Sequence, residues 1–408
     1  MKLVIYSVVL NQHQAPLADE LWNLTHHDFV FVELSRVKEY KGGAENYTNR
    51  PYLLQAWSTS EAYSQALLLA RTAECCIFSG VDALPFQKER MRLRLLSFDM
   101  SERWLKHGWK NLLSPRLLRW LSAYYLGGWY NKPLYKLSIS KFSALDHYRL
   151  GTFRGKCYKW GYFTRIEDIP FPEHRVLNTF SGDFQQENAE DVSFVPRSSS
   201  PIQLMWCGRF INCKHPELAI LLAHRLKKKG VSFQLHMYGD GEKRSEVEDA
   251  VKEFRLMDVV NFHGNVTNVQ VREAMKASDI FLFTSDRKEG WGAVANESLS
   301  CGCVLVASDV IGSSSYIIKD EYNGFQFHAP STKSSVKHPD FHALDDMEKK
   351  VFKVLEDKGK MCIMQKNAVE HINRLWSPRR AAENLLQLIE ELKNGHGTSI
   401  TEGPCSKA

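Results

Sequence analysis

Residues 278–313 have the sequence SDIFLFTSDRKEGWGAVANESLSCGCVLVASDVIGS. The apolar run at 279–285 predicts a buried strand, and the later run VLVASD predicts a second one. Between them lies a loop that contains Glu289 and the sequence GWG, and the residues after this loop predict a helix that contains Glu297. This order of strand, glycine-containing loop, helix and strand is typical of a layered α/β protein.

The loop and the helix after it have the chemistry of an anion site. Gly290 and Gly292 allow the backbone to approach a ligand closely and leave amide groups exposed at a helix N-terminus. A diphosphate would meet these N–H groups and the positive end of the helix dipole. Glu297 lies about two turns along, where its carboxylate can accept hydrogen bonds from a ribose diol, and Glu289 would reach a sugar. The alternative is an ordinary strand–loop–helix unit with two surface glutamates.

Short β-rich runs alternate with longer helical patterns along the chain, which predicts parallel sheets with helices between the strands. Strands are expected at 3–10, 29–34, 75–80, 201–208, 232–239, 259–264, 279–285 and 304–309, and helices at 60–73, 215–230 and 377–394. The alternation predicts an α/β protein with two doubly wound, Rossmann-like domains. Ligands of such domains bind at the carboxyl ends of the strands, here facing an interdomain cleft.

The composition of the sequence changes at the expected domain boundary. The polar segment 183–200 ends in a serine run and is the expected linker between a first domain at 1–182 and a second at 201–376. The amphipathic helix at 377–394 is expected to pack back toward the first domain. Residues 395–408 are expected to form a disordered tail.

The composition is that of a globular protein. The chain has 408 residues, of which 44% are hydrophobic and 25% are charged, and this length suits roughly two domains. Nine cysteines show no spacing typical of a zinc site or a disulfide framework, which favours buried thiols in a reducing compartment. The apolar N-terminal run is short and lacks a cleavage site, and no stretch is long enough to span a membrane. We therefore expect a cytoplasmic protein.

The E-x7-E pattern of Glu289 and Glu297, in its strand–loop–helix context, strongly resembles the family 4 glycosyltransferases of the GT-B fold. The resemblance extends to CGRFINCK at 207–214, which follows the first strand of the second domain. It implies that Arg209 and Lys214 bind the diphosphate of a nucleotide-sugar donor, where two fixed cations stabilise the charge that develops on the leaving group.

The same resemblance implies further donor contacts. MYGDGEKR at 237–244 is similar to a strand followed by Gly-x-Gly in the family, and VNFHGNV at 260–266 is similar to a segment that contacts the nucleobase. The implied donor site comprises Gly208, Gly239, His263, Gly290, Trp291, Gly292, Ala293, Val294 and Glu297. The implied catalytic residues are Arg209, Lys214, Glu289 and His13. Ser313 and Ser314 lie either near the phosphates or in a turn without a ligand, and His215 stands where the family usually has glycine.

The first domain is less explicit. Many family members have a glycine-rich loop after the first strand, whereas this chain has LNQHQAPLADEL. His13 lies where that strand would meet the cleft, so it is a candidate for a place near the reacting sugars, and the alternative is a histidine that orients the turn. Pro16 fits the start of a helix. Ser140 and Asp146 are expected at a strand–helix junction, in a capping role.

Three segments of this domain, at 101–109, 140–151 and 156–163, resemble bacterial members that assemble polysaccharide or lipopolysaccharide. The resemblance implies that the first domain binds an acceptor sugar, often on a lipid carrier. Lys159 and Trp160 would line the cleft, with packing of Trp160 under the last strand as the alternative.

Residues 88–119 are rich in Lys and Arg, with aromatic residues and leucines between them. This pattern favours contact with an anionic membrane surface, as expected of a peripheral protein on the inner face of the cell membrane. Nucleic acid also attracts basic and aromatic residues, but no nucleic-acid motif accompanies them. The remaining alternative is an ordinary basic helix whose aromatic residues are buried.

The resemblance as a whole implies a hexosyl- or other glycosyltransferase that retains the anomeric configuration, in cell-surface polysaccharide synthesis. It would use a nucleotide sugar and a saccharide or lipid-linked acceptor, without a metal or another cofactor. No Asp-x-Asp pair occurs in a suitable loop, which agrees with this expectation. Two alternatives stay open: another GT-B enzyme such as a nucleotide-sugar epimerase, and an inactive sugar-nucleotide-binding partner in an assembly complex.

Overall fold

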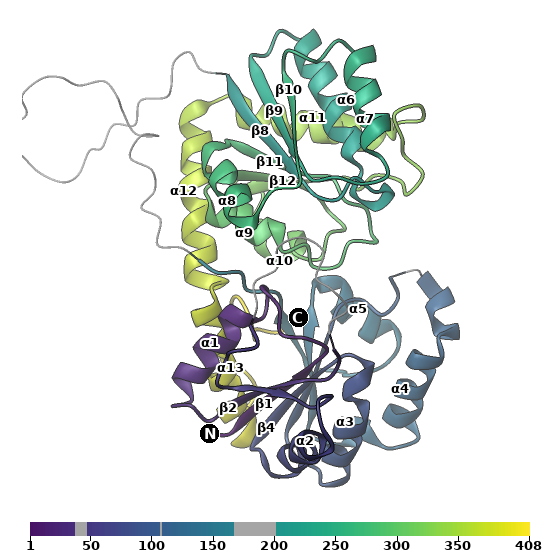
Figure 1. Cartoon of the computed structure of the whole chain (residues 1–408), viewed down its shortest axis with the longest axis vertical. Coiled ribbons are helices and arrows are strands. Elements are labelled where there is room, and N and C mark those ends of the chain that lie inside the picture. Colours follow the sequence, from purple (N-terminus) through teal and green to yellow (C-terminus); the bar gives the residue numbers. More distant parts are fainter. Residues whose placement is uncertain (37–46, 107, 167–200) are drawn as a thin grey trace, which may run out of the picture. The chain divides into compact units, whose positions relative to one another are not determined.

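The computed structural model describes residues 1–36, 47–106, 108–166 and 201–408 (Figure 1). The chain forms two compact units. The first comprises Met1–Arg165, Gly290–Ala293 and Arg374–Ala408, and the second comprises Ile166–Glu289 and Val294–Asn373. The expected linker at 183–200 lies outside the described residues.

In the described part of the first unit, seven parallel strands form one sheet in the order β3-β2-β1-β4-β5-β6-β7. Their bounds are β1 Leu3–Ser7, β2 Phe29–Glu33, β3 Leu53–Gln55, β4 Cys75–Ser79, β5 Ser97–Ser101, β6 Leu134–Ile139 and β7 Cys157–Trp160. β1 lies between β2 and β4, with Leu3 opposite Phe29 and Cys75. A central parallel strand is covered on both faces, which explains why every residue of LVIYS is buried.

Helices lie on both sides of this sheet (Figure 1). Their bounds are α1 Ala15–Leu24, α2 Ser60–Thr72, α3 Leu84–Arg92, α4 Pro115–Tyr125, α5 Lys141–Arg149 and α13 Pro378–Lys393. α2 and α3 pack on the β1 side chains Val4 and Tyr6, and α1 packs against α13 on the other side. Local signals agree with these bounds, since a proline lies in the first turn of α1 and Thr59 Oγ1 accepts a hydrogen bond from the Ala62 amide.

The described part of the second unit contains a sheet of six parallel strands in the order β10-β9-β8-β11-β12-β13. The strands are β8 Ile202–Cys207, β9 Phe233–Tyr238, β10 Val260–Gly264, β11 Ile280–Phe283, β12 Val304–Ser308 and β13 Gly324–Phe327. The helices are α6 Pro216–Lys228, α7 Arg244–Glu253, α8 Asn268–Ala277, α9 Val294–Ser300, α10 Ser314–Ile317, α11 Phe341–Leu355 and α12 Lys358–Leu375. Both sheets reverse their strand order beside their first strand, so the prediction of two doubly wound α/β domains is confirmed.

The C-terminal residues do not form the disordered tail that was expected at 395–408. Cys405 is fully buried, and its amide donates to the Lys159 carbonyl at 2.8 Å. The Lys159 amide in turn donates to the Ser406 carbonyl at 2.8 Å, and Lys407 forms an antiparallel bridge with Tyr158. The prediction was wrong because the polar composition of the tail does not show that β7 offers it a free sheet edge.

Residues 88–119 do not form the single basic surface that the sequence suggested. They pass through α3, the buried strand β5, the 3-10 helix η2 (Gly108–Leu113) and the start of α4. Arg90 is fully buried, where its guanidinium donates to Ser97 Oγ and to the carbonyls of Ala70, Ala73, Glu74 and Leu96. In the part of the chain that the structure describes, no helix is long and apolar enough to cross a bilayer.

Candidate donor site

The fold of the second unit brings two loops together. β8 and β11 are adjacent, and the strand order reverses between them, so the loop after β8 and the loop after β11 leave the same edge of the sheet side by side. The first loop carries Arg209 and Lys214, and the second carries Glu289. The order of strands therefore explains why residues so far apart in the sequence form one site.

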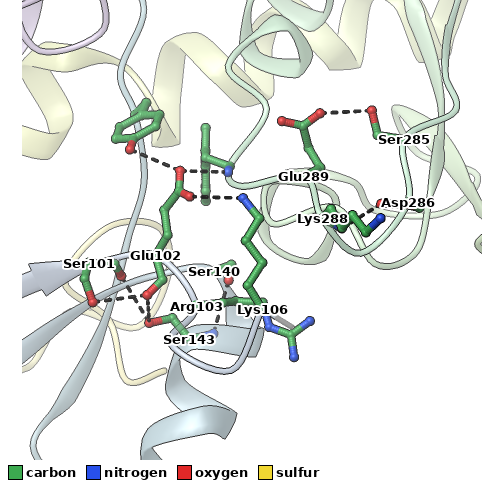
Figure 2. A network of polar contacts seen from close by, with 12 residues as sticks. Ser101, Glu102, Arg103, Lys106, Ser140, Ser143, Ser285, Asp286, Lys288 and Glu289 are labelled. Carbon is green, nitrogen blue, oxygen red and sulfur yellow. Dashed lines mark hydrogen bonds and ion pairs between the residues drawn. The ribbon is translucent and has the colours of Figure 1, made fainter. Parts of the chain in front are cut away.

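Lys214 and Glu289 form an ion pair within this unit. Lys214 ends the 3-10 helix η5 (Asn212–Lys214), and its carbonyl accepts a hydrogen bond from Thr284 Oγ1 at 2.7 Å. Glu289 Oε2 also accepts from Ser285 Oγ at 2.9 Å (Figure 2). Both charged side chains are largely buried, with 18% and 13% exposed, so the pair forms where water screens it weakly.

His215 also connects the loop after β8 to the loop after β11. Its ring is fully buried, with Nδ1 at 2.7 Å from Glu217 Oε1 and Nε2 at 3.4 Å from Asp286 Oδ2. Burial lowers the pKa of His215, but the hydrogen bonds with Asp286 and Glu217 outweigh it, and the pKa lies above its ordinary value. The residue has φ +46°, a left-handed conformation in which glycine carries no steric penalty. The two carboxylates hold histidine in this conformation.

Arg209 is exposed, and no described residue forms an ion pair with its guanidinium. The charge of Arg209 acts on the thiol of Cys213, and so do the charges of Lys214, Glu289 and Asp286. Arg209 therefore lies in the same part of the second unit as these residues. Burial is the main effect and raises the pKa of this thiol. The cationic and anionic side chains predicted from the sequence therefore lie around one cysteine.

Glu297 lies in the first turn of α9 and is 7% exposed. Its Oε1 accepts a hydrogen bond from Asn268 Nδ2 at 3.3 Å. Burial raises the pKa of Glu297, against the effects of Asn268 and Arg272. The charges of both Glu297 and Lys214 reach the thiol of Cys207, so Glu297 lies close to the cluster around Lys214.

Gly239, one of the glycines predicted as donor contacts, also has a structural reason to be glycine. A Cβ atom on Gly239 would lie 2.0 Å from the Gly208 carbonyl oxygen, and Gly239 has φ +114°. The Gly208 amide donates to the Tyr238 carbonyl at 3.0 Å. The loops after β8 and β9 thus touch backbone to backbone, and only glycine at position 239 allows this approach, whereas a Cβ on Gly208 would make ordinary contacts at 3.4 Å or more.

His263 lies in β10 with its ring exposed. The ring stacks on Tyr238, with the centroids 4.3 Å apart and the planes 9° apart, and Nε2 lies 3.0 Å from His236 Nδ1. Burial lowers the pKa of both histidines. The neutral ring presents a flat surface of the kind on which a nucleobase stacks.

Residues Gly290–Ala293, predicted as donor contacts, group with the first unit. Trp291 is fully buried and packs against Trp376, with ring centroids 5.7 Å apart. Its amide donates to Glu102 Oε1 at 3.2 Å, and Glu102 also pairs with Lys106 (Figure 2). Trp291 is therefore a packing residue, and its indole is not an exposed donor contact. Val294 begins α9 in the second unit.

The other candidates have the following places. His13 is half-buried in the first unit, its ring stacks on Tyr162 with centroids 6.0 Å apart, and burial lowers its pKa. Trp160 is buried against Phe163, as in the packing alternative. Ser140 Oγ accepts from the Ser143 amide at 3.2 Å, which is the expected N-cap.

Asp146 is a buried ion-pair partner of Arg103 and not a cap. In the second unit, Ser313 and Ser314 are fully buried, and Ser314 begins α10. The buried turn serines therefore do not present their side chains at the surface.

Sequence reasoning missed Ser285, Asp286 and Glu217, which hold the predicted residues in place. Ser285 and Asp286 stand within the quoted loop, but a serine and an aspartate in a loop are common and carry no signal of a partner. Glu217 is two residues after the left-handed position at His215, and an acidic residue early in a helix is expected for the helix dipole alone.

The chain is similar to known glycosyltransferases. Residues 189–371 match the family model of the glycosyl transferases group 1. A Bacillus subtilis protein named as a glycosyltransferase, EpsF, is 33% identical over 104 residues, which cover 26% of each chain. WcaL of Escherichia coli, named as a colanic acid biosynthesis glycosyltransferase, is 22% identical over 153 residues, which cover 35% of this chain and 36% of WcaL. The matches span 26%, 49% and 45% of the first three curated relatives, so the chain covers between about a quarter and about half of their length.

Solved structures extend the likeness to both units. The Anabaena protein Alr3699/HepE, solved in complex with UDP, superposes with a TM-score of 0.63 over 97% of this chain and 100% of the other, at 12% identity. The chain has the GT-B fold. This confirms the fold expected from the E-x7-E pattern, and at such identity the likeness concerns the fold alone.

Proposed function

We propose that this protein is a glycosyltransferase that moves a sugar from a nucleotide-diphosphate sugar to a saccharide acceptor. The observation that carries the proposal is the cluster of the second unit, in which Lys214 pairs with Glu289. Lys214 also shares the surroundings of the Cys213 thiol with Arg209 and those of the Cys207 thiol with Glu297. The group 1 match covers this cluster, and a fold relative is titled as a complex with UDP. The name of WcaL, a colanic acid biosynthesis glycosyltransferase, supports a role in polysaccharide synthesis.

The charges of the cluster suit the departure of a nucleoside diphosphate. In the structure, Lys214 is neutralised by Glu289, and Arg209 has no carboxylate partner among the described residues. A bound diphosphate would draw both cations, while Glu289, held by Ser285, would accept hydrogen bonds from the sugar hydroxyls. Two preorganised cations lower the barrier because negative charge grows on the diphosphate as the sugar–phosphate bond breaks.

We further propose that the enzyme retains the anomeric configuration and needs no metal ion. The bond from the anomeric carbon to the diphosphate oxygen breaks, and a bond to the acceptor oxygen forms on the same face. The acceptor proton passes to the leaving diphosphate, so that no protein base is required. The two cations would provide the charge that a metal provides in other transferases.

Lys214→Ala and Arg209→Ala test the proposal. Each variant should lose about 100-fold or more in kcat/KM for sugar transfer, because each removes a cation from the developing diphosphate charge. Lys252→Ala, on the exposed side of α7, is the matched control and should keep full activity. Transfer is measured as nucleotide release in the presence of saccharide acceptors, with and without EDTA, which should have no effect.

Near-wild-type turnover of Lys214→Ala would show that the diphosphate assignment is wrong. Nucleotide-sugar binding without turnover on any acceptor would instead favour an inactive binding partner. Conversion of the donor to an epimer would favour the other GT-B alternative.

A second candidate concerns the acceptor, which we propose to be carried on a lipid at an anionic membrane surface. The observation behind it is a group of apolar side chains on η2 and α4 that are more than half exposed. These are Trp109 at 60%, Leu113 at 80% and Leu118 at 52%, with the exposed Lys110 beside them. Apolar side chains next to a cation are typical of interfacial segments.

Flotation with anionic vesicles tests the membrane contact. The double variant Leu113→Glu/Leu118→Glu should lose most of the bound fraction, because two charges replace the apolar contacts. Met257→Glu is the matched control, since Met257 is 70% exposed in the second unit. Arg90 is unsuitable for this test because it is buried. A wild-type protein that stays with the vesicle-free fraction would contradict the membrane contact.

A further inference from the structure

The first unit contains a cavity of about 440 Å³ at the carboxyl ends of β4 and β5. Its wall comes from the residues after these strands, from η2 and from the start of α4, and none of the predicted donor residues lines it. The volume lies within the range of about 300–1,000 Å³ that is typical of small-molecule sites.

Two tryptophan rings form part of the cavity wall. Trp104 and Trp120 meet edge to face with their centroids 4.5 Å apart. Trp120 is 8% exposed, and its Nε1 has no hydrogen-bond partner among the described residues. A buried indole N–H normally has an acceptor, because an unpaired donor costs about 1–3 kcal/mol. The indole N–H of Trp120 is closed off from the cavity, so the rings offer a ligand their apolar surface, against which the C–H face of a sugar ring packs.

Three charged side chains line this cavity, and two of them form ion pairs with buried residues. Asp99 pairs with the fully buried Lys136, and Arg103 pairs with the fully buried Asp146. Arg116, near the start of α4, also lines the cavity, and no described carboxylate pairs with it. The wall therefore carries one positive charge that nothing in the described structure balances.

Hydrogen bonds hold this wall in place. Trp104 Nε1 donates to Ser101 Oγ at 2.8 Å, and Asn111 Nδ2 donates to the Trp104 carbonyl at 2.6 Å. Ser143 Oγ donates to the Ser101 carbonyl at 3.1 Å and fixes the end of β5 to α5 (Figure 2). Asp146 Oδ2 accepts from the Leu105 amide at 2.9 Å. A wall fixed in this way is preorganised, so little binding free energy is spent on ordering its side chains when a ligand binds.

We propose that this cavity binds a saccharide that carries one anionic group, a carboxylate or a phosphate. Arg116 binds the anion, and the indoles of Trp104 and Trp120 pack against the sugar ring. Naming this saccharide as the acceptor rests on the proposed function. The binding itself does not depend on that function.

Binding of three monosaccharides to the full chain tests the proposal by saturation-transfer NMR titration. Glucuronic acid carries a carboxylate, glucose 6-phosphate carries a phosphate, and glucose carries neither. At least one anionic sugar should bind about tenfold or more tightly than glucose, because a charge-assisted hydrogen bond to Arg116 is gained. The tighter of the two identifies the source of the anion. Equal binding of all three, or no saturable binding of either anionic sugar, would overturn the proposal.

Arg116→Glu should abolish the preference for the anionic sugar, and Arg116→Lys should keep most of it. Arg119→Glu is the matched control, because Arg119 is exposed on the same helix and does not line the cavity. An unchanged preference in Arg116→Glu would overturn the assignment. Displacement of the sugar by equimolar inorganic phosphate would show an anion site without sugar recognition and would overturn it as well.

UDP binding, measured by calorimetry on the same samples, separates this inference from the proposed function. Anionic sugar binding without UDP binding would leave the cavity assignment standing and weaken the proposed transferase. If the protein binds UDP and transfers sugar, and if Arg116→Glu keeps the preference for the anionic sugar, the proposed transferase would stand and the cavity assignment would fail.

Discussion

At the scale of single residues, Glu289 and His215 show how the second unit holds charge in place. Glu289 accepts from Lys214 and Ser285, so its carboxylate is fixed before any ligand arrives. His215 lies between Glu217 and Asp286, and its contact with Asp286 connects the loop of Lys214 to the loop of Glu289. Local arrangement of this kind reduces the reorganisation that catalysis would otherwise require.

The raised pKa of His215 predicts a pH dependence of stability. A histidine whose pKa is higher in the folded state contributes stability that is complete below its unfolded pKa of about 6.5 and is lost as the pH rises through the folded-state pKa. Urea unfolding of the wild type should therefore show a falling free energy over this window. His215→Gln, which keeps hydrogen bonding but cannot be protonated, should lack this decline.

A pH-independent difference between the wild type and His215→Gln would show that the pKa of His215 is the same in the folded and unfolded states and would contradict its raised pKa. His215→Gly serves as the second comparison, because glycine relieves the left-handed strain at φ +46° while it removes both hydrogen bonds.

At the scale of elements, the C-terminal residues complete the first sheet. Backbone hydrogen bonds join Lys159 to Cys405 and Ser406, and the Ala408 amide donates to the Cys157 carbonyl at 3.2 Å. Asn384 Nδ2, from α13, donates to the Pro404 carbonyl at 2.8 Å. The tail therefore covers the edge of β7 and connects it to α13.

Removal of residues 403–408 should lower the free energy of unfolding by about 2–4 kcal/mol. Each net backbone hydrogen bond contributes about 1 kcal/mol, and the buried Cys405 side chain adds its transfer free energy. Chemical denaturation monitored by circular dichroism provides the measurement, with Thr401→Ala, at an exposed position, as the control. A truncated protein as stable as the control would contradict the packing described for Cys405.

At the scale of the whole molecule, each unit is a doubly wound sheet whose loops emerge at the carboxyl ends of its strands. In the second unit these loops carry the charged cluster, and in the first they form the cavity beside Arg116. The GT-B fold thus gives each unit its own site at the same edge of an equivalent sheet.

Nucleotide binding should raise the melting temperature, because a ligand that binds the folded state alone stabilises it. The stabilisation reaches about 2.7 kcal/mol when the ligand is present at 100 times its Kd. Glu297→Gln should bind UDP about tenfold more weakly, since it removes a buried carboxylate acceptor, and should show a smaller thermal shift. Glu253→Gln, exposed on α7, is the control, and calorimetry gives both affinities. Unchanged affinity of Glu297→Gln would exclude its role toward the ribose.

The sequence by itself was enough to predict several strands of each sheet and the final helix. It also pointed to the charged residues of the candidate donor site. These features depend on periodicity, on capping and on a motif of short spacing, all of which are local. Glu289 and Glu297 were predicted from their spacing and context, and Arg209 and Lys214 from the family resemblance.

Tertiary structure alone decided which of the remaining residues are exposed and which are paired. Arg90 looks like a surface cation in the sequence, yet five oxygen acceptors between the end of α2 and the start of β5 surround it. Cys405 and Trp291 are buried, although both stand in polar, glycine-containing segments. The cavity beside Trp120 likewise arises from elements that meet through sheet order. The hydrogen-bond partners of Cys405 and Trp291 lie more than a hundred positions away along the chain, and no local pattern encodes such a contact.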